Sequence, residues 1–326
     1  MKVVVTRSLA GGVELLEQEA CVTNLWVAPP GIGPSRDEFL GRVKDADGVL
    51  CQFCELIDHE FFEAAGSNLK VVANYAVGFE NIDIEEATRR KVWVTNTPDA
   101  VTPSTADMAW ALMLGVSRRI CECDREVRSG KFAERSGYDP CHMLGGDFEN
   151  KTLLIVGAGR IGYATAIRSI GWNMRVLYTA RQVHREFEDS PLNAKRIDLD
   201  EGLAQADYVS LHTPLTNETR HLIGQRELGL MKVTAYLINT ARGSVVDEEA
   251  LVEALRKGMI AGAGLDVYED EPRQKAGLVD LPNTLLAPHV GSASREQRPL
   301  MARMAQENIL DALHGRRPKN ALNDLG

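Results

Sequence analysis

The fold of this chain is decided by the stretch Leu153-Leu154-Ile155-Val156-Gly157-Ala158-Gly159-Arg160-Ile161-Gly162, in which an apolar run leads directly into a GxGxxG pattern. Gly157 permits a tight turn, Gly159 lets the backbone approach a pyrophosphate, and Gly162 allows a helix to pack closely on the strand. The N-terminus of that helix offers free N–H groups and a positive dipole end to phosphates. In this strand-turn-helix context the pattern indicates dinucleotide binding, against the alternative of a chance glycine turn.

Short apolar runs alternate with longer amphipathic stretches on both sides of this glycine loop, which predicts βαβ units and mostly parallel sheets. In the first hundred residues we expect strands at 2–5, 48–51, 70–73 and 92–94, and helices at 12–20, 35–46, 59–65 and 84–90. A second α/β unit should begin at residue 151, with strands at 152–156, 175–178, 208–211, 235–239, 262–267 and 284–287. The predicted fold class is α/β, with two Rossmann-like or flavodoxin-like domains.

A connection rich in proline and threonine, residues 96–105, separates the two predicted units. It should be extended, because the residue before a proline avoids the helical region, and Ser104 or Thr105 can cap the helix that follows. That helix is expected at 106–129, where its apolar residues suit either a subunit interface or a buried core. A last helix is expected at 294–315.

Composition excludes several classes of function. The 326 residues predict about two domains, and a net charge of −9 argues against a nucleic-acid surface. The first residues carry too short an apolar run for a signal peptide, and the longest apolar run, near 108–116, is too short to span a membrane. Six scattered cysteines favour a reducing cytoplasm, and the lone Cys51–Cys54 pair lacks the second pair of a zinc site, so no metal is expected.

The residues after the second strand of the cofactor unit bear on the choice of dinucleotide. An NAD site usually has an acidic residue there, but Thr179-Ala180-Arg181-Gln182 has none, and the next acid is Glu186. Arg181 could pair with a 2′-phosphate, assisted by Thr179 or His184, or could be a solvated surface charge. The sequence thus predicts that NADP(H) is preferred and that NAD(H) remains possible.

Three chemically active residues follow the later strands of the same unit. Arg242, Glu271 and His289 should meet at one rim, because ligands bind beyond the carboxyl ends of parallel strands. An imidazole can protonate the carbonyl oxygen of a 2-keto acid during hydride delivery, a carboxylate can hold the other ring nitrogen, and an arginine can grip a carboxylate. We therefore assign His289 as general acid/base, Glu271 as its partner and Arg242 as substrate anchor.

Each of these residues also has a structural alternative. Taken alone, Glu271 could be a solvated charge in an acidic loop, Arg242 could pair with Asp247, and His289 could be a buried histidine with satisfied hydrogen bonds. All three residues follow strands of the same unit, and a common function explains this placement much better than chance does.

At this point the sequence resembles the D-isomer-specific 2-hydroxyacid dehydrogenases along nearly its whole length, most of all the glyoxylate and hydroxypyruvate reductases. The resemblance is carried by Gly157 to Gly162 and by segments 211–216, 238–243, 264–272, 287–292 and 73–83. The family's catalytic Arg, Glu and His fall on the trio already named. Departures from the family pattern are Glu80, Lys91 and Leu154, and none touches that trio.

The resemblance implies further roles and a domain arrangement. Asp266 would hold the nicotinamide carboxamide, and the N–H groups of Ala76, Val77 and Gly78 would bind the substrate carboxylate. Residues 1–99, completed by 290–326, would form the substrate domain, with the dinucleotide domain 100–289 inserted and the active-site cleft between them. The helix at 106–129 would support a homodimer. Cofactor contacts are also expected at Thr105, Thr213, Pro214, Thr219, Thr240, Ala241 and Gly291, and substrate contacts at Phe53 and Ser292.

The predicted activity is NADPH-dependent reduction of glyoxylate or hydroxypyruvate to glycolate or D-glycerate. An apolar wall at Phe53 favours small substrates, and segment 52–55 offers no cation for the phosphate of a phosphoglycerate. A formate dehydrogenase would carry Gln at position 271. A D-lactate-type specificity remains open, and so does a dinucleotide-sensing corepressor-like protein, although the chain lacks the extended tail expected there.

Overall fold

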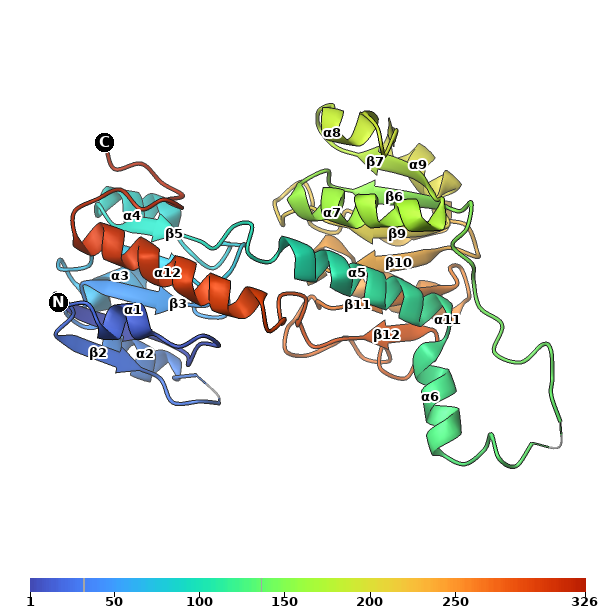
Figure 1. The fold of residues 1–326 in the computed structure, drawn as a ribbon, viewed down its shortest axis with the longest axis horizontal. Coiled ribbons are helices and arrows are strands. Elements are labelled where there is room, and N and C mark those ends of the chain that lie inside the picture. The colour runs from blue at the N-terminus through green and yellow to red at the C-terminus, as the bar shows by residue number, and fades with distance from the viewer. Residues whose placement is uncertain (32, 136) are drawn as a thin grey trace. The chain divides into compact units, whose positions relative to one another are not determined.

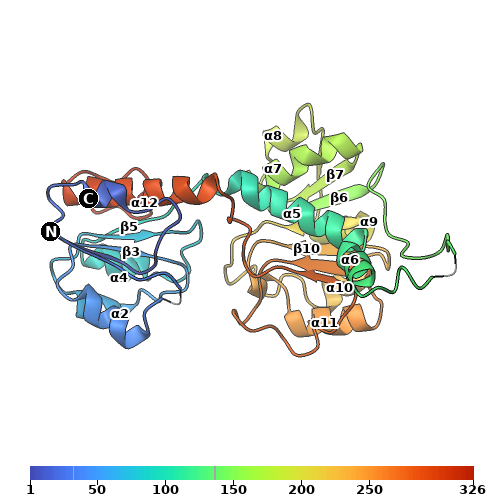
Figure 2. The ribbon, with the colours of Figure 1, turned by 60° about the horizontal axis from the view of Figure 1, so that its bottom comes forward.

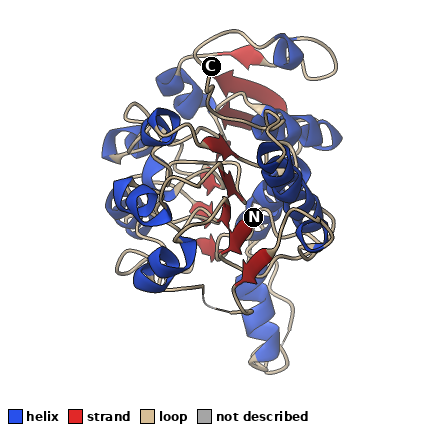
Figure 3. Ribbon diagram, turned by 90° about the vertical axis from the view of Figure 1, so that its left-hand side faces the viewer, coloured by secondary structure: helices blue, strands red, loops and turns tan. Residues whose placement is uncertain are grey.

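The computed structural model describes residues 1–31, 33–135 and 137–326, and it divides the chain into two compact units. Unit 1 comprises Met1–Val101 and Ser292–Gly326, and unit 2 comprises Thr102–Gly291. Each unit is an α/β layer structure built on a parallel sheet, so the predicted fold class is confirmed. Figure 3 shows the strands flanked by helices on both sides.

Unit 1 contains a five-stranded parallel sheet in the order β2-β1-β3-β4-β5 (Figure 1). The inner strands are short apolar runs that are buried on both faces, as parallel sheets require. The strands are β1 (Lys2–Val5), β2 (Asn24–Val27), β3 (Gly48–Cys51), β4 (Val71–Asn74) and β5 (Trp93–Thr95). The edge strand β2 is not among the predicted strands, although Leu25, Trp26 and Val27 form an apolar run; these side chains are only partly buried.

Helices cover both faces of this sheet. Figure 2 shows α1 (Glu14–Glu17) and α12 (Gln297–Leu313) on one face, and α2 (Arg36–Val43) and α4 (Ile84–Arg89) on the other. The helix α3 (His59–Ala65) packs between α2 and α4. Side chains of Ser35, Asp58 and Asp83 accept N–H groups of the first turns of α2, α3 and α4, which fixes where these helices begin.

Unit 2 contains a seven-stranded parallel sheet in the order β12-β11-β10-β9-β6-β7-β8. The glycine loop follows β6, the strand at which the sequence order of the sheet changes direction: β7 lies on one side of it and β9 on the other. The strands are β6 (Thr152–Val156), β7 (Arg175–Thr179), β8 (Lys195–Arg196), β9 (Tyr208–Leu211), β10 (Tyr236–Asn239), β11 (Gly262–Leu265) and β12 (Thr284–Leu286). The two-residue strand β8 was not predicted, since it is too short to carry a pattern.

In unit 2, α5 (Thr102–Ser117) and α7 (Arg160–Arg168) pack together on one face of the sheet. The opposite face carries α9 (Leu199–Gln205), α10 (Gln225–Leu230) and α11 (Glu248–Arg256), as Figure 2 shows for the last two. The remaining short elements are η1 (Ser169–Trp172), α8 (Arg185–Glu188) and η2 (Gly243–Val245).

The single helix predicted at 106–129 is wrong. The chain forms α5 and then α6 (Ile120–Arg128), separated by Arg119, whose φ of 54° places it in the left-handed region. The helix also begins earlier than predicted, so Ser104 and Thr105 lie within its first turn and do not precede it as caps. Figure 1 shows α6 extending away from the body of unit 2. Among the described residues, no helix is long and apolar enough to cross a membrane.

Candidate active site

The glycine loop of unit 2 has the local geometry that its sequence predicts. Gly157 follows β6 with φ of 103°, and a Cβ there would lie 2.7 Å from the carbonyl of His212. A Cβ on Gly162 would lie 2.2 Å from the carbonyl oxygen of Gly157, so this position allows α7 to approach the strand. Above Gly159, by contrast, no atom of the described residues lies within 4 Å of where a Cβ would stand, apart from its neighbours in the chain. The first and third glycines serve packing, whereas the second leaves open space for a ligand.

Two buried hydroxyls lie at the same edge of the sheet without a protein partner. Thr213 follows β9 and Thr240 follows β10, and their Oγ1 atoms make no hydrogen bond within the described chain. Buried hydroxyls normally find partners, so an orphaned pair at a ligand-binding edge favours a polar ligand. With the glycine loop and the N-terminus of α7, these residues fit a dinucleotide.

Two arginines lie beside the end of β7, one in the segment that follows it and one on the neighbouring strand β8. Arg181 and Gln182 are exposed, and the guanidinium of Arg196 donates from Nε to the carbonyl of Ala180 at 2.9 Å and from Nη2 to that of Arg181 at 3.0 Å. Thr179 donates from its hydroxyl to the carbonyl of Ile197, so that hydroxyl is already engaged. Arg196 was missed because it belongs to the short strand β8. Both arginines place positive charge where an NAD-specific site would have an acid.

Arg242 is positioned by the residue that ends β10. The side chain of Asn239 accepts from the N–H of Ala241 at 3.0 Å and donates to the carbonyl of Arg242 at 2.9 Å, which closes the turn from 239 to 242. Arg242 itself donates from Nη1 to the carbonyl of Ala241 at 2.7 Å. Asp247, considered above as a partner for Arg242, instead caps α11 by accepting from the N–H of Ala250. Asn239 thus fixes the turn that carries Arg242.

Asp266 organises the turn that carries His289. Its two carboxylate oxygens accept from the N–H groups of Val290 at 2.8 Å and Gly291 at 2.7 Å, while its own carbonyl accepts from the N–H of His289. Burial raises the pKa of Asp266, although those two N–H groups act in the opposite direction. His289 has a φ of 53°, a left-handed conformation that is uncommon outside glycine. These three hydrogen bonds hold it there.

His289 and Glu271 form a direct pair. Nδ1 of His289 lies 2.7 Å from Oε2 of Glu271, and Oε1 of Glu271 accepts from the N–H of Tyr268 at 2.9 Å. Burial opposes ionisation of Glu271, but the hydrogen bond and charge of His289, the Tyr268 N–H and the charge of Arg242 outweigh it and hold the pKa of Glu271 below its usual range. The carboxylate therefore orients the ring through Nδ1.

The other residues predicted to contact the cofactor differ in exposure and in their contacts. Thr219 closes the loop after β9 by donating to the carbonyl of Pro214 at 2.7 Å. Thr105 lies in α5 beside Gly291, whose Cβ position is 3.6 Å from its methyl carbon. Ala158 and Ala241 are buried, Ile161 is half-buried, and Arg160 is exposed.

In unit 1, three consecutive carbonyls after β4 are held from within the protein. Ala76 O accepts from the Thr97 N–H, Val77 O from the Asn96 side chain at 2.7 Å, and Gly78 O from the Asn74 side chain at 2.8 Å. The N–H groups of the same three residues donate to no other part of the described chain. Three successive N–H groups without an acceptor in the described chain suit an anionic ligand.

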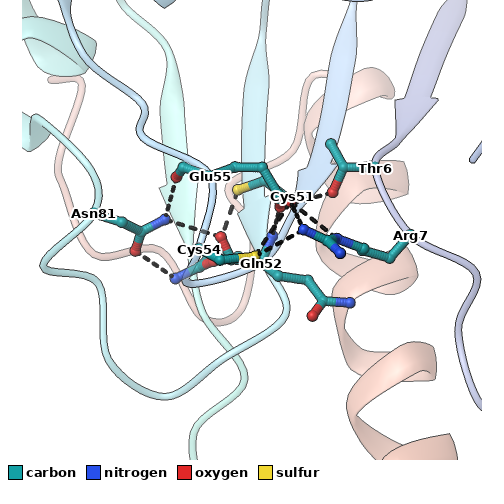
Figure 4. Close-up of polar contacts among 8 residues, drawn as sticks. Thr6, Arg7, Cys51, Gln52, Cys54, Glu55 and Asn81 are labelled. Atoms are coloured by element: carbon teal, nitrogen blue, oxygen red, sulfur yellow. Dashed lines mark hydrogen bonds and ion pairs between the residues drawn. The ribbon is translucent and has the colours of Figure 1, made fainter. Parts of the chain in front are cut away.

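Asn81 joins this loop to the one after β3. Its side chain donates to the carbonyls of Gln52 at 3.1 Å and Glu55 at 2.8 Å and accepts from Asn74 at 3.3 Å (Figure 4).

The carboxylate of Glu55 also holds the loop after β3. This residue is 6% exposed, and its side chain accepts from the hydroxyl of Thr6, from the N–H of Gln52 and from the guanidinium of Arg7 (Figure 4). Phe53, on the same loop, is exposed. Ser292 lies where the chain re-enters unit 1. Asn74, Asn81 and Glu55 were not singled out from the sequence. A polar residue that ends a buried strand, as Asn74 does, is a signal that could have been used.

Comparison with known proteins was made against these observations. Residues 110–291 match the family model described as D-isomer specific 2-hydroxyacid dehydrogenase, NAD binding domain. A glyoxylate reductase of Thermococcus onnurineus is 47% identical over 324 residues, which are 99% of this chain and 96% of that protein.

Solved structures agree with this result. A glyoxylate reductase from Paecilomyes thermophila has a TM-score of 0.87 and 32% identity, covering 99% of this chain and 98% of that one. An NADPH-dependent glyoxylate/hydroxypyruvate reductase from Sinorhizobium meliloti, in complex with NADP and malonate, has a TM-score of 0.84 and 27% identity, covering 99% and 97% of the two chains.

Proposed function

Because the chain belongs to the D-isomer-specific 2-hydroxyacid dehydrogenase family, we propose that it reduces glyoxylate or hydroxypyruvate to glycolate or D-glycerate with NADPH, using His289 as the general acid. It is an NAD(P)-dependent oxidoreductase acting on CH–OH groups, and its substrate is a small keto or hydroxy acid. The observation that carries the proposed mechanism is the 2.7 Å pair of His289 and Glu271 at the edge of the sheet that bears the glycine loop.

The nicotinamide dinucleotide, when bound, supplies the hydride to the carbonyl carbon. Arg242 binds the substrate carboxylate and polarises the carbonyl, so that negative charge on the oxygen is stabilised as it develops. His289 donates the proton from Nε2 to that oxygen, because Glu271 engages Nδ1. Water then returns a proton to the imidazole. The N–H groups of residues 76–78 offer a second hold on the carboxylate.

Preference for NADPH is supported by Arg181 and Arg196 at the end of β7. We expect kcat/KM with glyoxylate to be at least ~10-fold higher for NADPH than for NADH, since a charge-assisted hydrogen bond contributes about 1.5–3 kcal/mol. Arg181→Ala should raise the KM for NADPH and leave that for NADH near its original value. The exposed Arg185 on α8 provides the matched control, because Arg185→Ala removes a nearby charge that has no proposed phosphate contact.

The cofactor proposal fails if NADH is the better substrate by ~10-fold, a difference of about 1.4 kcal/mol. A substrate panel with both dinucleotides also tests the activity itself. Dinucleotide binding without turnover of glyoxylate, hydroxypyruvate or pyruvate would favour a sensor in place of an enzyme, and efficient turnover of pyruvate alone would favour a D-lactate-type specificity.

Asn81 is proposed as a positioning residue for the two loops of unit 1. Asn81→Ala removes three hydrogen bonds, each worth about 1 kcal/mol, so the KM for the keto acid should rise ~10-fold or more. The kcat and the KM for NADPH should change much less, because the residues assigned to the dinucleotide and to proton transfer lie in unit 2.

The exposed Asn24, at the start of β2, is the control for that experiment, and Asn24→Ala should leave both constants unchanged. A fall in thermal stability of Asn81→Ala with no change in the KM for the keto acid would reduce Asn81 to a structural role.

Self-association and location are further proposals. Ile120 and Val127 on α6, and Phe132, Tyr138 and Leu144 beyond it, are large and exposed, which favours a homodimer through this region. Light scattering should then give about twice the chain mass of 35.8 kDa, and a mass equal to one chain would reject the dimer. All six cysteines are free thiols, which supports the cytoplasm as the proposed compartment; detection of the native protein only outside the cytoplasm would reject it.

A further inference from the structure

Three metal-ligating side chains that have no role in the proposed reaction converge in unit 1. Glu19 and Cys21 lie in the loop between α1 and β2, and His314 directly follows α12. Nε2 of His314 lies 3.9 Å from Sγ of Cys21 and 3.6 Å from Oε1 of Glu19, and the three ligand atoms all lie within 4.8 Å of one another. We propose that Glu19, Cys21 and His314 bind a Zn²⁺ ion.

The separations suit a shared ion better than direct contacts. Zinc–sulfur bonds of about 2.3 Å and zinc–nitrogen or zinc–oxygen bonds of about 2.0–2.1 Å give tetrahedral edges of roughly 3.6 Å between S and N and 3.4 Å between N and O. The observed distances exceed these edges by a few tenths of an ångström. The 3.6 Å between His314 and Glu19 is too long for a hydrogen bond, which leaves that ion pair with little energy of its own.

The donor set selects the metal. A thiolate and an imidazole favour Zn²⁺ over the oxygen-seeking Mg²⁺ and Ca²⁺, and three protein ligands leave the fourth tetrahedral position to water. The side chains of Glu19 and His314 are 26% and 34% exposed, so an ion can enter from solvent. Oε1 of Glu19 also accepts from the N–H of Cys21 at 3.4 Å, which keeps the carboxylate on the cysteine side of the loop.

The position indicates a structural role. A metal here would join the loop before β2 to the end of α12, two segments whose ligands are 293 positions apart in the sequence. The site precedes β2, at the amino ends of the strands, whereas the substrate loops follow the carboxyl ends of β3 and β4 in the same parallel sheet. Binding should therefore stabilise unit 1 and leave the reaction unaffected.

Cobalt provides a direct probe of the site. The full-length protein is freed of metal with a chelator and titrated with Co²⁺ near neutral pH. We expect one Co²⁺ per chain, with the near-ultraviolet absorption of a thiolate–cobalt bond and the visible bands of a tetrahedral ion, both displaced by Zn²⁺. Zn²⁺ at ~100 times its Kd should raise the Tm by about 5 °C.

Matched variants separate this site from adventitious binding. Cys21→Ser and His314→Ala should each abolish the cobalt bands and the Tm increase while the circular dichroism spectrum, and hence the fold, is retained. Cys123→Ser, which alters another half-buried thiol, and Glu17→Gln, which alters an exposed acid on α1, should leave both unchanged. Absence of the thiolate–cobalt band in the wild-type protein, or its survival in Cys21→Ser, would overturn the proposal. Because neither readout depends on turnover, the result is independent of the proposed activity.

Discussion

His289→Ala should lower kcat for keto-acid reduction by at least ~10²-fold, the usual scale of general acid catalysis. Without the imidazole, no side chain assigned here can protonate the carbonyl oxygen as the hydride arrives. Binding of NADPH should change little, because the glycine loop and Arg181 follow β6 and β7, whereas His289 follows β12. Steady-state kinetics and a fluorescence titration with NADPH measure the two effects separately.

Two further variants make the experiment decisive. His59 is an exposed histidine in unit 1, and His59→Ala should retain full activity. Glu271→Gln keeps the shape of the side chain but removes its negative charge, so a positive imidazolium is stabilised less. The fall of the reduction rate with rising pH should then begin at a lower pH than in the wild type. An unshifted profile removes Glu271 from its proposed role, and a His289→Ala variant with more than a tenth of normal kcat means that another group supplies the proton.

The parallel strands of both units could be predicted from sequence because their burial on two faces demands short runs of apolar residues. The bounds of β1, β3, β6 and β9 agree with prediction to the residue. β2 was missed although Leu25, Trp26 and Val27 form such a run, and β8 was missed because two residues are too few to carry a pattern. The break at Arg119 was also missed, because α5 and the mostly polar α6 are separated by one left-handed residue that is neither glycine nor asparagine.

The candidate site shows a similar limit. Arg242, Glu271 and His289 were found because the carboxyl ends of parallel strands share an edge, and this rule needs only the order of strands. The groups that hold them, Asn239 and Asp266, act through hydrogen bonds to backbone atoms that the rule does not address. Their partners depend on the path of two turns. Such supporting contacts become visible only once the backbone is placed.

Gly243→Ala should be the most damaging small substitution in unit 2. A Cβ at this position would stand 1.8 Å from the carbonyl carbon of Tyr268 and 2.4 Å from the nitrogen of Glu269. Both are backbone atoms, so rotation of a side chain cannot relieve the clash. The segment around residue 243 must instead move away from the segment at 268–269. One carries Arg242, and the other leads to Glu271. We expect a loss of about 3 kcal/mol or more in the free energy of unfolding.

Activity should fall further than stability alone explains, since the separation that relieves the clash also moves Arg242 away from Glu271. Urea denaturation measures the loss of stability. The kcat of the variant, measured where it is still folded, gives the loss of activity separately. Gly41 in α2 is the matched control, because no atom of the described residues outside its own stretch of helix lies within 4 Å of its Cβ position. Gly41→Ala should be neutral or stabilise by up to ~1 kcal/mol, since alanine favours a helix over glycine. If Gly243→Ala matched that control, the close approach of these segments would be dispensable, and so would the geometry that brings the arginine to the carboxylate.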